Sequence, residues 1–393
     1  MNESAAGLKR WTQRFVVAST AAFAATLLSI PAGADGRTVV LLGLFGFVCP
    51  MIFGMGYLLL PPYAGRTLSE PRLAGVHFVL AYLGVAFLVG GWLRDGIGTL
   101  FTAGAVLWTL GVATFVGSLA ATVCPVLLER PGDVFKLGDR PQRSTRVATA
   151  AIPVALGYLL IGTVALLAST PLVEQSVAFP RVSHVYAFGF GAVLVFALGA
   201  RLLVGFYHVS PPRSLAWPTL AAGAIAPAFL AAGLGRPRWF RVGALLAGIA
   251  MVCYLLLVAV VAVRTDRSRT ELAGIGLGAL AGALAVAVAL PLAFGAGIED
   301  AVAVHRTLVL AGFFPLTIAG YAYQFFPVPD GRFPGASERT VALSIALLAS
   351  GVTVQAAGIA CGTAQTQVRS VGVALSFVGA VVYGGLLAGR FAT

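Results

Sequence analysis

Long apolar runs with almost no charge follow one another from one end of the chain to the other. Hydrophobic residues make up 59% of the 393 residues and charged residues only 10%, whereas an ordinary soluble domain carries about 25% charged residues. Runs of roughly 20 apolar residues are long enough to cross a bilayer as helices. The sequence therefore predicts an all-α integral membrane protein of the cell membrane, in contact with the lipid bilayer.

The pattern predicts twelve transmembrane helices that form a single transmembrane domain over residues 1–393. The seventh of them is the weakest, because Pro218 and Pro227 interrupt it. The first has a second interpretation as a secretory signal peptide, but its apolar run is long for such a segment. The predicted spans lie near residues 13–34, 38–60, 73–93, 98–128, 147–169, 182–206, 214–234, 239–263, 272–297, 303–327, 339–361 and 369–391.

The cationic residues predict the orientation. With the N-terminus in the cytoplasm, 17 of the 26 Lys and Arg residues fall in cytoplasmic segments or at cytoplasmic span ends and 8 on the outer side, and Arg201 lies deep inside a span. This bias predicts that both termini are cytoplasmic. The net charge of +12 is thus a topology signal. Since the chain has no soluble basic surface, we expect no binding of nucleic acid.

Three of the predicted helices share one pattern. In "HVYAFGFGAVLVFALG" glycines follow seven and fifteen residues after His184, and "HRTLVLAGFFPLTIAGYAYQFFP" repeats both spacings from His305. The same spacings start at Val39, and Pro61 and Pro327 both fall 22 residues after the start of their copies. These helices are the second, sixth and tenth. The chain is therefore predicted to hold three pseudo-repeated four-helix units, near residues 13–129, 147–263 and 271–391.

Helical geometry places the repeated residues together. At about 100° per residue, the histidine, the two glycines and the proline lie on one stripe of the helix. Glycine lets a neighbouring backbone or a flat ligand approach closely, so the stripe is either a tight helix interface or the wall of an interior site. A histidine on the same stripe of two copies favours the second interpretation. We therefore expect His184 and His305 to face a shared interior site.

His184, His305 and His77 are the candidate cofactor or metal ligands. His184 and His305 lie near the outer ends of their spans, and neutral imidazole is a common ligand of haem iron and copper. His77 lies early in the third span, near the cytoplasmic side. The fourth histidine, His208 in "FYHVSPPR", is expected in a loop. For each histidine in a span, an interfacial position without any ligand is the alternative.

Other features argue against several classes of protein. All 14 Asp and Glu residues lie in loops or at span ends, which counts against proton-coupled transport. No motif of a hydrolase or of a phosphate-binding loop stands out. Arg201 is the one charge predicted at depth, and it either snorkels to the interface or pairs with an anionic ligand.

The sulfur-containing residues carry a weaker signal. The four cysteines form no CxxC motif, and we expect them to be buried structural thiols. Cys49, Met51 and Met55 would suit cuprous copper, but helix packing explains this cluster better.

The twelve spans, the cytoplasmic N-terminus and the spacing of histidine, glycines and proline resemble the haem-copper oxidase subunit I superfamily. That superfamily includes the nitric oxide reductase large subunit and the NnrS-like membrane proteins. The resemblance implies three four-helix units around haem and copper, with ligands toward the outer halves of the repeated helices. It also implies that His305 is a haem ligand and that His184 is the counterpart of a copper ligand.

The chain also departs from that superfamily. Val39 stands where the second helix would carry a haem-binding histidine, and the seventh span, "SLAWPTLAAGAIAPAF", has no histidine for copper. His305 is alone where the tenth helix typically carries two histidines. The resemblance therefore implies a degenerate member without a complete dinuclear centre, in which reduction of oxygen or nitric oxide is absent or feeble.

These observations favour a haem- or metal-binding membrane protein on an oxidase-like scaffold. Its expected roles are accessory electron transfer, response to nitric oxide, or handling of haem or copper, with other respiratory membrane subunits as partners. The alternative is a transporter, or an assembly partner of a respiratory complex, that binds no metal. Whether the chain is itself an enzyme stays open.

The predicted topology is tested by cysteine accessibility. The four native cysteines are replaced by serine, and a single cysteine is placed in the 130–146 loop. A membrane-impermeant maleimide should leave this loop unlabelled in intact cells and label it after permeabilisation. A cysteine at Asp35, in a segment predicted outside, should be labelled in both. Labelling of the 130–146 loop in intact cells would show that the loop lies outside, and it would contradict the predicted orientation.

Overall fold

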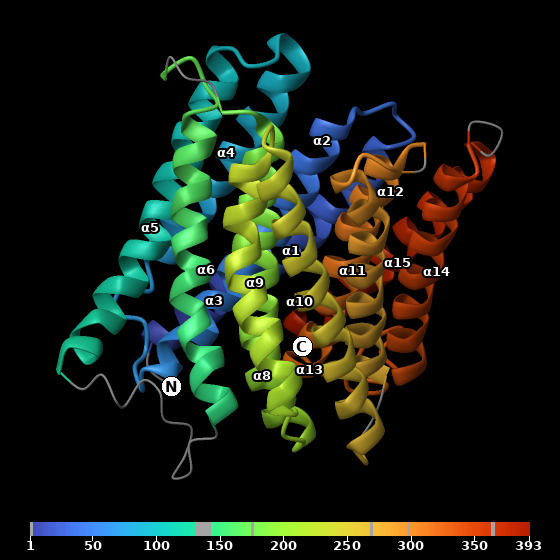
Figure 1. The fold of residues 1–393 in the computed structure, drawn as a ribbon. Coiled ribbons are helices and arrows are strands. Elements are labelled where there is room, and N and C mark those ends of the chain that lie inside the picture. The colour runs from blue at the N-terminus through green and yellow to red at the C-terminus, as the bar shows by residue number, and fades with distance from the viewer. Residues whose placement is uncertain (1–2, 130–142, 174–176, 268–269, 298, 363–365) are drawn as a thin grey trace. The chain divides into compact units, whose positions relative to one another are not determined.

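The computed structural model describes residues 3–129, 143–173, 177–267, 270–297, 299–362 and 366–393, and within these ranges the regular structure is entirely helical (Figure 1). The elements are α1 Glu3–Ser29, α2 Gly36–Val40, η1 Leu41–Val48, α3 Cys49–Tyr63, α4 Leu73–Asp95, α5 Thr99–Glu129, α6 Arg143–Leu167, α7 Phe179–His184, η2 Val185–Ala192, α8 Val193–Tyr207, α9 Arg213–Gly233, α10 Pro237–Arg264, α11 Thr270–Ala293, α12 Ala301–Thr307, η3 Leu308–Phe313, α13 Phe314–Phe325, α14 Glu338–Ala360 and α15 Thr366–Ala392.

Eleven helices in the described residues are long and apolar enough to cross a membrane, which indicates an integral membrane protein that contacts lipid. They coincide with the second to twelfth predicted spans. The predicted first span corresponds to α1, which is not among the eleven and ends at Ser29, before Pro31. The predicted seventh span is one continuous helix, α9, despite Pro218 and Pro227. Residues 130–142 of the predicted cytoplasmic loop lie outside the described residues.

Three spans change helical type along their length. The second span consists of α2, η1 and α3, the sixth of α7, η2 and α8, and the tenth of α12, η3 and α13. In each, a short α-helix leads into a π-helical segment, in which the backbone hydrogen bonds close a wider turn. These are the three helices that share the sequence pattern.

Glycine lies at a matching place in all three wider turns, and proline follows two of them. Gly46, Gly191 and Gly312, the first glycines of the repeated pattern, all fall inside π-helical segments. Pro50 and Pro315 are the second residues of α3 and α13, directly after η1 and η3. Proline lacks an N–H and crowds the carbonyl group four residues earlier, so a wider turn before it relieves the contact.

The same three helices are the most buried ones. In the most apolar window of each, 78%, 67% and 61% of the residues are buried, against 33–44% in the other eight candidate spans. Protein rather than lipid therefore surrounds most of their surface. This shelter suits a π-helical segment and an internal proline, because neighbouring helices protect backbone groups that an α-helix would pair.

The chain divides into two compact units, of which the first comprises Met1–Ser19 and Val40–Leu198. Within it, α4 packs along α5 at glycines: a Cβ atom on Gly84 would lie 2.9 Å from the backbone N of Trp108. Aromatic rings fill the interior around Trp108, whose indole N–H donates to the hydroxyl of Tyr186 at 2.8 Å. The glycines let the backbones of α4 and α5 lie close together, and the large aromatic rings fill the space around Trp108.

The second compact unit comprises Thr20–Val39 and Gly199–Thr393. Its neighbouring pairs are α9 with α10, α10 with α11, and α14 with α15. Element α11 also packs along η3 and α13 at glycines: a Cβ atom on Gly278 would lie 2.7 Å from the backbone N of Thr317, and one on Gly320 would lie 2.8 Å from that of Ile275. We call this contact the α11 seam.

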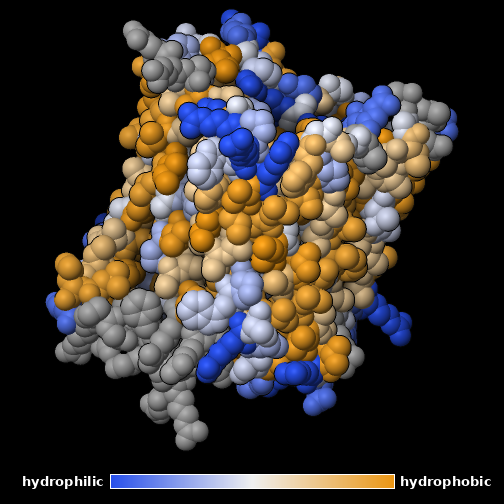
Figure 2. All heavy atoms as spheres, in the orientation of Figure 1, coloured by the Kyte–Doolittle hydropathy of each residue, from blue (hydrophilic) through white to orange (hydrophobic). Residues whose placement is uncertain are grey.

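The surface of this unit has the polarity expected in a bilayer. Over α9, α10 and α11, hydrophobic side chains cover the middle of the helices and hydrophilic ones gather near the ends (Figure 2). On α10 the exposed apolar side chains recur at helical spacing, as Leu245, Ile249, Val252 and Leu256. This face of α10 is thus suited to lipid contact.

Two neighbouring glycines of α11 test the seam. Gly278→Ala should lower the free energy of unfolding by about 1–3 kcal/mol, because the new methyl group would overlap the backbone of Thr317. Gly276→Ala should leave it unchanged or raise it by up to about 1 kcal/mol, since a Cβ atom there meets nothing closer than 3.9 Å and alanine favours helix. Thermal unfolding in detergent measures both, and equal effects would contradict the packing described.

Candidate functional site

His305 lies in α12, at the start of the tenth span, with its ring directed at α11. Its Nδ1 atom is 2.9 Å from the backbone carbonyl oxygen of Ala285. A carbonyl oxygen only accepts hydrogen bonds, so Nδ1 carries the proton. In the neutral ring the lone pair then lies on Nε2, the nitrogen that a metal would use.

His184 has the same arrangement in its own unit. It is the last residue of α7, and its Nδ1 atom is 2.7 Å from the carbonyl oxygen of Pro180, one turn earlier in the helix. Nδ1 is again the protonated nitrogen, and Nε2 again holds the lone pair. The two histidines that the sequence aligns therefore share one tautomer.

The π-helical segments follow both histidines closely. Val185, the first residue of η2, comes directly after His184, and Leu308, the first residue of η3, comes three residues after His305. A π-helical turn often marks a functional site. Both candidate ligands thus stand where their helix changes its pitch.

The two histidines belong to different compact units, His184 to the first and His305 to the second. The structure describes each within its own unit. The expectation that they face a shared interior site therefore stays a prediction.

The glycines of the repeated stripe admit close neighbours. A Cβ atom on Gly312 would lie 2.8 Å from the Cβ atom of Ala281, and one on Gly320 would lie 2.6 Å from the carbonyl oxygen of Glu271. His305, Gly312 and Gly320 all contact α11, so in the second unit the stripe does lie on one face. That face forms the α11 seam. In the second unit the glycine stripe is therefore a tight helix interface, the first of the two interpretations offered by the sequence.

His77 lies in α4 and is fully buried in the first unit. The rings of Phe15, Phe53, Tyr57 and Phe115 surround it, with centroids 4.7–5.8 Å from its own. Its Nδ1 atom is 3.1 Å from the hydroxyl oxygen of Tyr57, and its Nε2 atom is buried without a hydrogen-bond partner. The sequence did not reveal this aromatic cage, because its four rings come from three helices, α1, α3 and α5, and His77 from a fourth.

The remaining candidates are placed as follows. His208 follows α8 in an exposed loop, as expected. Arg201 is only 3% exposed, so its guanidinium does not snorkel to the interface. The expectation of buried thiols holds for Cys49, whereas Cys253 is half-buried. It is wrong for Cys124, on an outward position of α5, and for Cys361, which directly follows the end of α14, since both are exposed.

In the part of the chain that the structure describes, no three His, Cys, Asp or Glu side chains gather closely enough to hold a metal ion. The chain matches no protein-family model, and no curated protein matches it. Chemical interpretation therefore rests on the individual histidines and their hydrogen bonds.

His77 supports a test of its aromatic cage. His77→Phe keeps an aromatic ring in the cage. It removes the unpartnered Nε2, which offsets the loss of the hydrogen bond to Tyr57, so the free energy of unfolding should change by less than about 1 kcal/mol. His77→Ala should lower it by about 3 kcal/mol, because a cavity is left between four rings. Thermal unfolding of both variants measures the difference, and a large loss in His77→Phe would contradict a purely packing role.

The metal content of the same samples tests the expectation that His77 is a ligand.

Proposed function

We propose that this chain is a haem- or metal-binding membrane protein in which His305 and His184 are the ligands. The observation that supports the proposal is the shared hydrogen bonding of the two rings. Each donates Nδ1–H to a backbone carbonyl group, at 2.9 Å and 2.7 Å. In each neutral ring the lone pair therefore lies on Nε2.

The donor set fits haem in chemical terms. A porphyrin supplies four ligands to its iron, so a single imidazole suffices on one face. A carbonyl acceptor behind the imidazole fixes the tautomer and the orientation of the ring, and it makes Nε2 more basic. A bound haem would supply one-electron chemistry or an open position for a diatomic gas.

The residues of the chain perform the remaining tasks. The carbonyl group of Ala285 holds the proton on Nδ1 of His305, and that of Pro180 does the same for His184. Both histidines are half-buried, and they lie in the spans with the most buried apolar windows. An apolar surrounding of this kind also tunes the redox properties of a site.

The three-unit organisation is part of the same proposal. It is supported by the π-helical segments, which occur at matching places in the second, sixth and tenth spans. The prolines after η1 and η3 and the high burial of the same three helices also support it. Under this proposal the scaffold is oxidase-like and lacks a complete dinuclear centre, and its role is accessory electron transfer, response to nitric oxide, or handling of haem or copper.

Haem content tests the ligand assignment. The chain is expressed with ample haem and copper, and the purified protein is measured by its Soret absorbance and by metal analysis. In His305→Ala and in His184→Ala the occupancy of the bound group should fall by about tenfold or more. Loss of a group that merely supports a metal ligand already lowers metal affinity by at least about tenfold. His208→Ala is the matched control, because His208 is exposed in a loop, and it should retain full occupancy.

Two outcomes would contradict the proposal. Purified protein without haem or metal under these conditions would favour the alternative, a transporter or assembly partner that binds neither. Unchanged occupancy in both variants, with folding intact, would remove the two histidines as ligands.

A further inference from the structure

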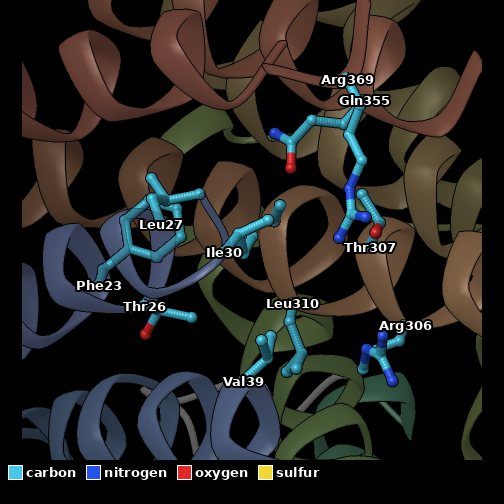
Figure 3. A pocket seen from close by; sticks show the side chains of 11 residues that line it. Phe23, Thr26, Leu27, Ile30, Val39, Arg306, Thr307, Leu310, Gln355 and Arg369 are labelled. Carbon is cyan, nitrogen blue, oxygen red and sulfur yellow. The ribbon is translucent and has the colours of Figure 1, made fainter. Parts of the chain in front are cut away.

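The second compact unit contains a small cavity that the proposed function does not use (Figure 3). Its walls come from α1 and Ile30 directly after it, from α2, and from α12, η3, α14 and α15. Its polar lining includes Arg306, Arg369, Thr307 and Gln355. Four polar side chains from three helices thus meet at one place in an apolar protein.

Two guanidinium groups give the cavity its positive charge. Arg306 and Arg369 lie close enough for their charges to repel each other, and Asp35 attracts Arg306. Among the described residues, no hydrogen bond and no ion pair joins either Arg306 or Arg369 to another group. Two such cations near each other are more stable with an anion between them.

Arg306 is held in place by its surroundings. Its guanidinium packs against Gly36, where any Cβ atom would overlap Nη1. The absence of a side chain at this position therefore makes room for the charged group. Arg369 is exposed and stands at the mouth of the cavity, so the pair combines one fixed cation with one accessible cation.

Gln355 supplies an acceptor. Its Nε2 donates to the hydroxyl oxygen of Ser376 at 2.8 Å and lies 3.3 Å from the carbonyl oxygen of Gly372. The amide oxygen is therefore the end that faces the cavity, as Figure 3 shows. It suits a ligand that carries a hydroxyl group beside its negative charge, such as a protonated phosphate or the headgroup of phosphatidylglycerol.

The position and size of the cavity indicate how a ligand would enter. Arg306 and Arg369 lie near the starts of two candidate spans, Ala301–Phe325 and Gln367–Ala392, where the phosphates of a bilayer lie. Phe23, Leu27 and Leu310 form its apolar side. The interior accommodates the centres of water molecules over only about 20 Å³, room for about one water, so an anion would bind at the mouth and not be enclosed.

We propose that Arg306 and Arg369 form a binding site for a phosphate group, carried by an anionic lipid or present as free phosphate. The two arginines bind the phosphate oxygens, Gln355 accepts from a hydroxyl group of the ligand, and the apolar side meets the hydrocarbon when the ligand is a lipid. No histidine lines the site, although Arg306 directly follows His305 in α12.

Thermal unfolding of the full chain in nonionic detergent tests the proposal. Dioleoylphosphatidylglycerol is titrated against dioleoylphosphatidylcholine, and sodium phosphate against sodium chloride at equal ionic strength. In the unmodified chain at least one phosphate carrier should raise the Tm in a saturable way. Stabilisation by phosphatidylglycerol alone identifies the lipid as the source, whereas stabilisation by sodium phosphate as well shows that free phosphate also binds.

The variants distinguish binding from structure. Arg369→Gln should raise the concentration needed for half-maximal stabilisation at least tenfold, because it removes the accessible cation. Without any phosphate carrier it should leave the Tm unchanged or raise it, because it relieves the repulsion with Arg306. Arg238→Gln, an exposed arginine of the same unit on the predicted outer side, is the control and should bind as the unmodified chain does.

Three results would overturn the proposal. The first is that no phosphate carrier stabilises the unmodified chain beyond its chloride or phosphatidylcholine control. The second is that Arg369→Gln leaves the half-maximal concentration unchanged. The third is that Arg238→Gln weakens stabilisation as much as Arg369→Gln, which would show a general effect of surface charge.

Discussion

The structure depends on one constraint, which is that lipid offers no hydrogen-bond partner to the peptide backbone. The chain meets it with long continuous helices on its lipid-facing surface, of which α10 is an example. In the part of the chain that the structure describes, the wider π-helical turns occur only in the three spans with the most buried apolar windows, where neighbouring helices shelter the backbone from lipid. Departure from the α-helix is thus confined to the part of the molecule that tolerates it, and both candidate ligands lie beside such a departure.

The sequence predicts the helices well because hydropathy and length decide them. The bounds of α4 to α15 agree with the predicted spans to within a few residues, and even α9 persists through two prolines. The end of α1 was placed five residues too late, because the apolar run continues past the point where Pro31 and Gly33 end the helix. The π-helical segments could not be predicted, since they change the hydrogen-bond pattern and leave the hydropathy unchanged.

The candidate site was predictable in its residues and not in its contacts. The spacing of glycines drew attention to His184 and His305, but the partner of His305 is a main-chain oxygen of Ala285, which has no signature in the sequence. The cage around His77 consists of residues from separate helices, and so does the cluster of the two cations Arg306 and Arg369. Only the fold brings these residues together. The exposed Cys124 and Cys361 show the converse, since position within a span does not determine which side of the helix faces outward.

The hydrogen bond from His305 to Ala285 has a consequence for how this ring is controlled. Because the acceptor belongs to the main chain, replacing the side chain of Ala285 does not remove it. The hydrogen bond depends on the spacing of α11 and α12, and the glycines of the α11 seam, Gly278 and Gly320, bring α11 close to the following helix α13. The position of the main chain therefore controls the hydrogen bond of this ring, and a shift of a whole helix would change it.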